Sequence, residues 1–311
     1  MRRRQSTVDR ASKGGKKEEF RKTDRMELCV QPFLKWPGGK RWLVSTLIQM
    51  IGPQEYGTYR EPFLGGGALF FALRPKQSVL SDVNADLINT YRQVKNNSKE
   101  LLQRLQNFPV NQATYDRFRK QRTGSTLERA IRFLYLNRTA FGGMYRLNEQ
   151  GGFNVPFGGG ERTAAPLWKY GLLQSAAGAL RSSKLCAVDF EEALSAPVKG
   201  DLVYCDPTYT VAHNNNGFIR YNERNFSWED QKRLARCCRE AASRGALVLV
   251  SNAYHDEVLR LFDPPQHVVV TRPSRLCPQI EHRRTIDEFV FLFPPRTAAT
   301  KKLARRGVHE K

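Results

Sequence analysis

A segment with the residue types for amine chemistry occurs at Asp206-Pro207-Thr208-Tyr209, directly after the apolar run Leu202–Cys205. The run predicts a buried strand of a parallel sheet, and ligands gather where such strands end. A carboxylate and a main-chain carbonyl can accept the two N–H bonds of an exocyclic amine, while an aromatic ring stacks on a planar base. Asp206, the Pro207 carbonyl and Tyr209 would supply these parts. Taken alone, such a tetrapeptide is also typical of a simple turn after a strand.

Two earlier segments have the pattern of a nucleoside site. Gly57-Thr58-Tyr59-Arg60-Glu61 predicts a short strand, and the glycine run at 65–67 predicts a tight turn that opens a helix around residues 68–71. A ligand can approach such a turn closely because its backbone carries no side chains. A second predicted strand, residues 78–81, ends at Asp82, whose carboxylate suits the two hydroxyls of a ribose. The pattern predicts a doubly wound α/β sheet and is compatible with either a dinucleotide or S-adenosylmethionine.

Four segments, in this order, resemble the Dam-type (D12 class) adenine-N6 DNA methyltransferases: residues 36–40 (Trp-Pro-Gly-Gly-Lys), 61–67 (Glu-Pro-Phe-Leu-Gly-Gly-Gly), 81–84 (Ser-Asp-Val-Asn) and 206–209. The resemblance implies a class I methyltransferase (Rossmann-like) mixed sheet with an inserted, mainly helical target-recognition subdomain. It implies transfer of a methyl group from S-adenosyl-L-methionine to an adenine flipped out of duplex DNA. It also implies cofactor contacts from Trp36, Lys40, Phe63, Asp82 and Asp206.

Outside this family context, two of these side chains have ordinary structural interpretations. Trp36 would be a core aromatic residue, and Lys40 would be the first charged residue of a solvated helix. Residues 37–40 lack the glycine spacing of a phosphate loop, and Arg41 stands where such a loop carries Ser or Thr. Nucleotide hydrolysis is therefore not favoured.

The segment 206–209 departs from the family's Asp-Pro-Pro-Tyr at Thr208. Replacement of a proline frees φ and adds an amide donor, so we expect a less rigid loop. A DNA-binding relative that has lost catalysis is therefore one alternative. A Rossmann-type oxidoreductase is another, but it leaves the segment 206–209 without a role. Cofactor binding together with turnover would distinguish these classes.

The stretch 95–185 is helical and basic, which predicts an insert between two halves of a catalytic domain. Within it, polar and apolar residues alternate loosely on both sides of Gln150-Gly151-Gly152, which predicts a β-hairpin. Arginines on such a ribbon can read guanine edges, and an apolar residue can open a base step. A surface hairpin with solvated arginines has the same pattern.

The hairpin resembles the target-recognition hairpin of the family in the pair Asn137-Arg138, in Arg146 and in residues 153–158 (Phe-Asn-Val-Pro-Phe-Gly). Gly142 and Met144 stand where GATC-specific members carry Asn and Leu, so the target sequence stays open. The resemblance implies that Phe141 is the wedge and that Arg146 reads a base. In total it implies DNA contacts from Arg138, Phe141, Arg146 and Asn154.

The charge balance agrees with a polyanionic partner. The chain has 51 Lys and Arg against 30 Asp and Glu, a formal net charge of +21, and about half of the excess lies in residues 1–25 and 296–311. These ends predict disordered basic tails that attract phosphates without regard to sequence. Charge alone would also suit RNA or an anionic surface, and only together with the motifs does it favour duplex DNA.

The predicted division is a basic tail at 1–25, an S-adenosylmethionine-binding catalytic domain at 26–94 and 186–295, a target-recognition subdomain at 95–185 and a basic tail at 296–311. The six cysteines show no metal-ligand spacing, so we expect reduced thiols, no metal and a cytoplasmic protein. The sequence contains no run of 18 apolar residues, so we expect no membrane-spanning helix. We expect a monomer without an obligate protein partner, and whether a restriction nuclease accompanies it stays open.

The rest of the catalytic half is also predictable. Ser227-Trp228-Glu229-Asp230 predicts a capping box for a helix to Ser243, stopped by Gly245. Residues 246–250 predict a buried strand ending at Ser251-Asn252, which resembles the next family motif and would line the adenine pocket or cofactor cleft. Residues 267–271 and 286–293 predict a final hairpin.

Two stretches near these elements have possible roles on DNA. The connection of the final hairpin would carry phosphate-binding or merely solvated arginines, namely Arg272, Arg275, Arg283 and Arg284. The polar run 213–217, just beyond Tyr209, predicts a loop that can close over a flipped base.

Overall fold

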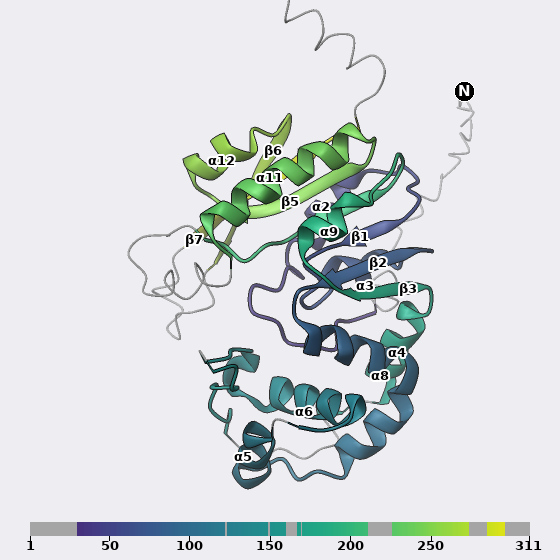
Figure 1. Cartoon of the computed structure of the whole chain (residues 1–311), viewed down its shortest axis with the longest axis vertical. Coiled ribbons are helices and arrows are strands. Elements are labelled where there is room, and N and C mark those ends of the chain that lie inside the picture. Colours follow the sequence, from purple (N-terminus) through teal and green to yellow (C-terminus); the bar gives the residue numbers. More distant parts are fainter. Residues whose placement is uncertain are drawn as a thin grey trace, which may run out of the picture.

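The centre of the molecule is a sheet of seven strands (Figure 1). The computed structural model describes residues 30–121, 123–148, 150–159, 167–168, 170–210, 226–273 and 285–295. The strands are β1 (Tyr59–Glu61), β2 (Ser78–Asp82), β3 (Ser183–Ala187), β4 (Leu202–Cys205), β5 (Leu247–Ala253), β6 (Gln266–Pro273) and β7 (Thr285–Phe293).

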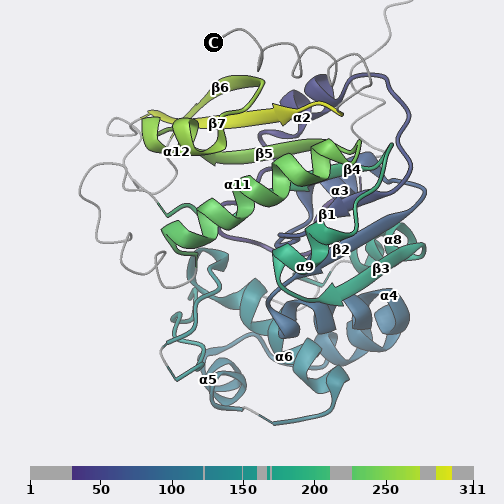
Figure 2. The same ribbon diagram turned by 45° about the horizontal axis from the view of Figure 1, so that its top comes forward.

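Their order in the sheet is β3-β2-β1-β4-β5-β7-β6. Neighbours among β1 to β5 are parallel, whereas β7 is antiparallel to both β5 and β6. Figure 2 shows β7 inserted between β5 and β6 at one edge. This is the strand order of a class I methyltransferase, so the predicted fold class and the final hairpin are confirmed.

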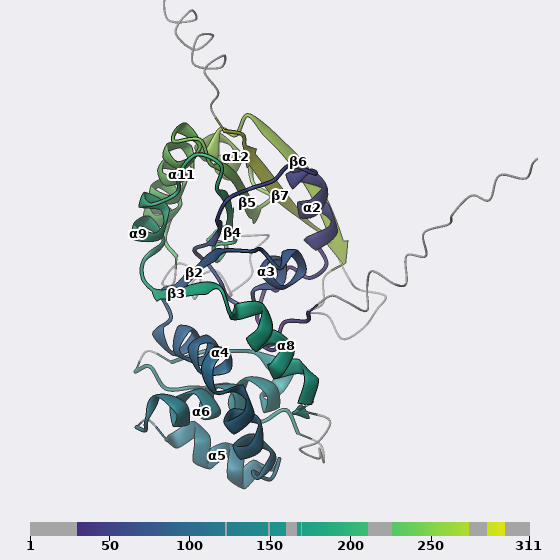
Figure 3. The same ribbon diagram turned by 90° about the vertical axis from the view of Figure 1, so that its right-hand side faces the viewer.

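Helices cover both faces of the sheet. On one face lie α9 (Phe190–Ser195), α11 (Trp228–Ser243) and α12 (Asp256–Phe262); on the other lie α2 (Val44–Ile51) and α3 (Ala68–Leu73) (Figure 3). Successive side chains of a strand point to opposite faces, so a strand buried on both sides is apolar throughout. In β4, Leu202 and Tyr204 join the core under α2 and α3, while Val203 and Cys205 join the core under α11.

The insert is a mainly helical subdomain beyond the β3 edge of the sheet, in the lower half of Figure 1. It consists of α4 (Ala85–Gln106), α5 (Gln112–Lys120), α6 (Thr126–Thr139), the short 3-10 turn η1 (Phe141–Gly143) and α8 (Tyr170–Leu180). α4 leaves the sheet directly after β2 and packs against both α6 and α8. Its helix is interrupted at Asn97, where φ is −129° and ψ is 29°.

The expected insert boundaries fall inside regular elements. Residue 95 lies within α4, and residue 185 lies within β3, which pairs with β2 from Ser78↔Ser183 to Asp82↔Ala187. The strand β3 was not expected from the sequence. It is a five-residue edge strand that begins with a serine and an exposed lysine, so it lacks the fully buried apolar run that identifies β4.

The predicted helix from Ser227 is confirmed with its capping box. The Ser227 Oγ accepts the main-chain N–H of Asp230 at 3.2 Å, and the Asp230 carboxylate accepts that of Ser227 at 2.9 Å. Gly245 follows the helix with φ of 102°, a conformation that favours glycine. The next strand extends to Ala253, one residue beyond the predicted end at Asn252.

Several predictions concern segments outside the described residues. These are the two tails, the loop 213–217 and three of the arginines expected to contact phosphates: Arg275, Arg283 and Arg284. Within the described part of the chain, the helices are too short or too polar to cross a membrane.

Candidate active site

A group of polar side chains occupies one face of the sheet where β1, β4, β5 and β7 lie side by side. Its members are Glu61, Asp206, Ser251 and Glu288, with Lys40 among them from the segment before α2. The alternation that buries Leu202 and Tyr204 under α2 and α3 also directs Asp206 to that side. We call these five residues the polar cluster.

Lys40 occupies the middle of the polar cluster. Its ammonium lies 3.0 Å from Asp206 Oδ1 and 3.5 Å from Glu288 Oε2, donates to the Gly38 carbonyl at 3.1 Å, and sits 4.6 Å from the centre of the Tyr209 ring. Only 5% of Lys40 is exposed. The interpretation of Lys40 as a solvated helix residue is therefore wrong. Two carboxylates and a main-chain carbonyl contact its ammonium in place of solvent.

Asp206 is held by hydrogen bonds on one of its two oxygens. Ser251 Oγ donates to Oδ1 at 2.7 Å, and Tyr204 OH lies 3.0 Å from the same Ser251 hydroxyl. Burial raises the pKa of Asp206, while Lys40 and Ser251 oppose that rise. The Lys40 ammonium at 3.0 Å favours the charged form of Asp206, whose side chain is 20% accessible.

Tyr209 is tied to the opposite side of the cluster. Its hydroxyl donates to Glu288 Oε2 at 2.6 Å, and burial raises the pKa of the phenol well above its ordinary value. Pro207 is buried, whereas Thr208 is exposed. The residue that departs from the family pattern therefore lies at the surface of the loop.

Glu61 is the fully buried acid at the end of β1. Its carboxyl accepts a hydrogen bond from Tyr59 OH at 2.8 Å. Burial raises the pKa of Glu61 to about 8, and the nearby Asp206 adds to the effect. Glu61 is therefore mainly protonated at neutral pH.

The predicted nucleoside site lies at the carboxyl ends of β1 and β2. Asp82 accepts the main-chain N–H of Gly65 at 3.1 Å on one oxygen and that of Asn84 at 3.0 Å on the other. Each carboxylate oxygen has a further lone pair for a ligand hydroxyl. Phe63, half-buried on the intervening turn, stacks on Phe190 with ring centres 5.3 Å apart.

Trp36 covers part of the glycine turn. A Cβ at Gly65 would lie 2.7 Å from Trp36 Nε1, and one at Gly66 would lie 3.2 Å from Trp36 Cβ. The sequence predicted that a ligand would contact bare backbone at this turn. At Gly65 and Gly66, however, the Trp36 side chain packs on the backbone. On its other side Trp36 stacks on Tyr145, with ring centres 5.4 Å apart, so this cofactor-motif residue also packs against the insert.

The predicted hairpin is present as a close antiparallel connection. Isolated bridges join Leu147 to Phe153 and Ala140 to Phe157, and Asn148 N donates to the Gly152 carbonyl at 2.8 Å. Over the described residues from 140 to 159 these bridges do not extend into continuous strands, because glycines, Pro156 and a 3-10 turn interrupt the run.

The four predicted DNA contacts have different surroundings. Phe141 is 58% exposed on η1, as a wedge residue requires. Arg146 Nε donates to Asn154 Oδ1 at 2.8 Å across the connection. Arg138 instead turns toward the Leu167 carbonyl at 3.3 Å, and burial lowers the pKa of its guanidinium. The placement of Arg138 thus supports packing of the subdomain more directly than contact with DNA.

Ser251 and Asn252, expected together at the adenine pocket or cofactor cleft, point in opposite directions. Ser251 contacts Asp206, whereas Asn252 Nδ2 donates to Gln231 Oε1 of α11 at 3.0 Å on the other face. The period of two along β5 separates them. Only Ser251 therefore belongs to the polar cluster.

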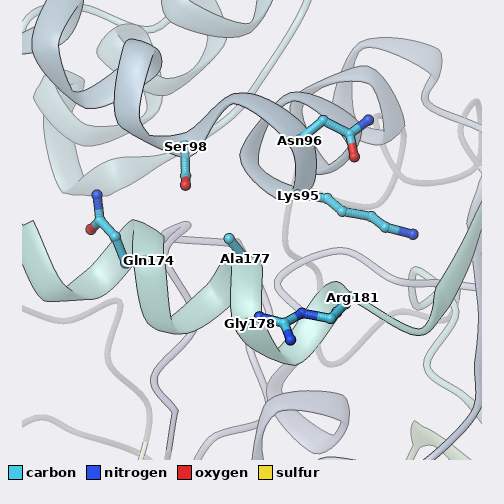
Figure 4. A pocket seen from close by; sticks show the side chains of 7 residues that line it. All are labelled: Lys95, Asn96, Ser98, Gln174, Ala177, Gly178 and Arg181. Atoms are coloured by element: carbon cyan, nitrogen blue, oxygen red, sulfur yellow. The ribbon is translucent and has the colours of Figure 1, made fainter.

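A shallow cavity of about 320 Å³ lies between α4 and α8. Lys95, Ser98, Gln174 and Arg181 are among its lining residues (Figure 4). It includes none of the residues predicted to bind cofactor or base.

Residues 36–272 match the family of D12 class N6 adenine-specific DNA methyltransferases. The chain belongs to this family. A Type II methyltransferase of Lactococcus lactis subsp. cremoris is 38% identical over 238 residues, covering 73% of this chain and 82% of that protein. The DNA adenine methylase of Escherichia coli K12 is 30% identical over 279 residues, covering 87% and 98%. A solved protein of Pyrococcus horikoshii, described as a proposed RNA methyltransferase, has a TM-score of 0.39 and 11% identity over 88% of this chain and 98% of that one.

The family and the adenine-specific DNA methyltransferase function predicted from the motifs are therefore confirmed. The sequence did not predict that Glu288 belongs to the polar cluster, nor that Glu61 is a buried acid. Glu288 directly precedes the apolar residues 289–293 in the strand Thr285–Phe293, and an acid next to such a run was the available signal.

Proposed function

We propose that this methyltransferase transfers a methyl group from S-adenosyl-L-methionine to N6 of an adenine flipped out of duplex DNA. The observation that carries the proposal is the polar cluster around Asp206, beside Tyr209 and at the same sheet edge as Asp82. Near the end of β4 the chain offers a carboxylate, a carbonyl and an aromatic ring; near β2 it offers a carboxylate beside a glycine turn.

The residues near β2 fit the proposed cofactor. Asp82 would accept the ribose hydroxyls with the lone pairs that Gly65 and Asn84 leave available. Phe63 would pack beside the adenine ring of the cofactor, and Trp36 and Lys40 would border it. When bound, the cofactor supplies an electrophilic methyl group.

Asp206 would hold the amine of the flipped base. The contacts with Lys40 and Ser251 both involve Oδ1, so Oδ2 is the oxygen that would face the amine. With the Pro207 carbonyl, Oδ2 would accept the two N–H bonds and turn the nitrogen lone pair toward the methyl donor. Tyr209 would stack on the base, so the chemistry needs mainly proximity and orientation. The proton released from the amine would pass to Asp206 or to solvent.

The insert would select the site on DNA. Phe141 is exposed where a wedge could enter the duplex, and Arg146 is paired with Asn154 on the other arm of the connection. Site-specific adenine methylation of duplex DNA by a cytoplasmic, monomeric enzyme is the finer assignment that we infer. Roles for Arg138 and Asn154 on phosphates or bases belong to the same proposal.

Incubation of the full chain with duplex DNA and S-adenosyl-L-methionine, followed by mass spectrometry of the nucleosides, tests the proposal. Wild type should produce N6-methyladenine, and Asp206→Ala should produce none while keeping its DNA affinity, because phosphate contacts elsewhere dominate affinity. Asp82→Ala should weaken cofactor binding in calorimetry, since it removes charge-assisted hydrogen bonds worth about 1.5–3 kcal/mol each. Appreciable turnover by Asp206→Ala would refute the amine site.

A further inference from the structure

Glu288 is a buried acid without a role in the family resemblance described above. It lies on β7 opposite Ala253 of β5, and its side chain is fully buried. Its neighbour Phe289 joins the core under α11, so alternation turns Glu288 toward the face of the polar cluster. A charged group at such a position is expensive unless partners satisfy it.

Two partners come from segments distant in the chain. Tyr209 OH donates to Glu288 Oε2 at 2.6 Å across 79 residues of sequence, and the Lys40 ammonium lies 3.5 Å from the same oxygen. The Tyr209 bond is the shorter contact. It connects the loop after β4 with a strand two places away in the sheet, and that strand is held by β5 and β6 on both sides.

We propose that Glu288 is a positioning residue, which orients the Tyr209 ring for stacking on the target adenine by accepting the hydrogen bond of its hydroxyl. This inference rests on the proposed stacking role of Tyr209. The loop has a mechanical need for such a tie, because Thr208 replaces a proline that would have fixed φ next to the aromatic residue. The hydrogen bond from Tyr209 to Glu288 on β7 would restrain the loop in place of that proline.

The competing explanation is that Glu288 only balances the charge of Lys40. The two explanations differ in what Tyr209→Phe should do. That variant keeps the ring and leaves the Lys40 contact intact, but it removes the hydroxyl that Glu288 holds. Glutamine at position 288 keeps an acceptor oxygen without the charge, whereas methionine keeps a similar volume without an acceptor.

Single-turnover methylation rates at saturating DNA and cofactor provide the test, with the variants Glu288→Gln, Glu288→Met and Tyr209→Phe and the double variant Glu288→Met with Tyr209→Phe. We expect Glu288→Met and Tyr209→Phe each to slow methyl transfer about ten-fold, the order expected for loss of one charge-assisted hydrogen bond. Glu288→Gln should recover most of the rate. The double variant should be no slower than Glu288→Met, because both changes remove the same interaction.

Asp287→Asn is the matched control. Asp287 is adjacent on β7 but bonds to Thr271 Oγ1 at 2.6 Å on the other side of the strand, so this variant should methylate within two-fold of wild type. A slow Glu288→Met beside a fully active Tyr209→Phe would overturn the proposal in favour of charge balance at Lys40. Additive losses in the double variant would also overturn it. A wild type that forms no N6-methyladenine would instead refute the proposed function, so the two failures are distinguishable.

Discussion

Glu61 shows how one buried acid affects the whole stability curve. Its folded-state pKa is about 8, against an ordinary value of 4.5, because burial disfavours the charged form. The folded protein therefore binds a proton at this residue that the unfolded chain releases between about pH 4.5 and 8. The stability that protonated Glu61 contributes is complete below the lower value and is lost as the pH rises through the upper one.

We predict that Glu61→Gln flattens this dependence. From about pH 5 to 8 the free energy of unfolding of wild type should fall by up to about 1.4 kcal/mol per pH unit through this residue, and glutamine does not titrate. The variant should thus gain stability relative to wild type as the pH rises. Urea denaturation at several pH values measures it, with the exposed Glu100→Gln as control. Parallel curves for Glu61→Gln and wild type would contradict the prediction.

The pair formed by Arg146 and Asn154 makes a second prediction at this scale. Their bond uses Arg146 Nε, and a guanine edge would be read by the two terminal nitrogens. Arg146→Ala should cost about 1–3 kcal/mol of discrimination at one base position. Asn154→Ala should relax the same position less, because the arginine remains but is no longer oriented. Methylation of a randomised duplex library reads both variants; an even loss across all sequences would make Arg146 a structural or phosphate-binding residue.

At the scale of elements, the end of α6 fixes the chain segment before α2. Asn137, fully buried on α6, accepts the main-chain N–H of Lys35 at 3.0 Å and donates to its carbonyl at 2.6 Å. Trp36, which follows Lys35, stacks on Tyr145 of the insert. Gly143 is also constrained, since a Cβ there would collide with the side chain of Lys35. The insert therefore forms part of the support of the predicted cofactor site.

We predict that Asn137→Ala lowers both stability and cofactor affinity. Two main-chain groups of Lys35 lose their partner, which should cost about 1–3 kcal/mol of unfolding free energy, and Trp36 loses its fixed approach to the glycine turn. Denaturation and calorimetry with S-adenosyl-L-methionine measure the two effects. Asn96→Ala, at an exposed position of regular helix in α4, should change stability by less than about 0.5 kcal/mol. Normal cofactor affinity in the Asn137 variant would show that the contact is only structural.

Elements with strong local signals were predictable, and contacts between distant segments were not. The capping box at Ser227 and the apolar runs of β4 and β5 depend on neighbouring residues, so the sequence displays them directly. Lys40 differs: its burial follows from Asp206 and Glu288, which the chain brings to it only when the sheet forms. The two directions of Ser251 and Asn252 likewise depend on which face of β5 covers the site.

For the whole molecule, the position of the positive charge distinguishes general attraction from recognition. Half of the excess lies near the chain ends, outside the described residues, while the predicted readers of bases belong to the insert. We predict that removal of residues 1–25 weakens binding to all duplexes alike and flattens its salt dependence, because fewer phosphates are neutralised. Binding titrations at several salt concentrations test this. A changed target preference after the truncation would contradict it.

The dependence of Trp36 on the insert restricts how this enzyme can acquire new targets. Lys35 and Asn137 are 102 residues apart in the chain, yet the Asn137 side chain bonds both main-chain groups of Lys35. A recombination event that imported only the insert of a relative would keep the contact with the main chain of Lys35 wherever that insert carries the family's asparagine. It would remove the stacking partner of Trp36 wherever the insert lacks an aromatic residue at position 145. Diversification in this lineage should therefore proceed through point substitutions at exposed positions such as Phe141 and Asn154, or through paired inheritance of the first segment and the insert. Engineered chimeras face the same requirement.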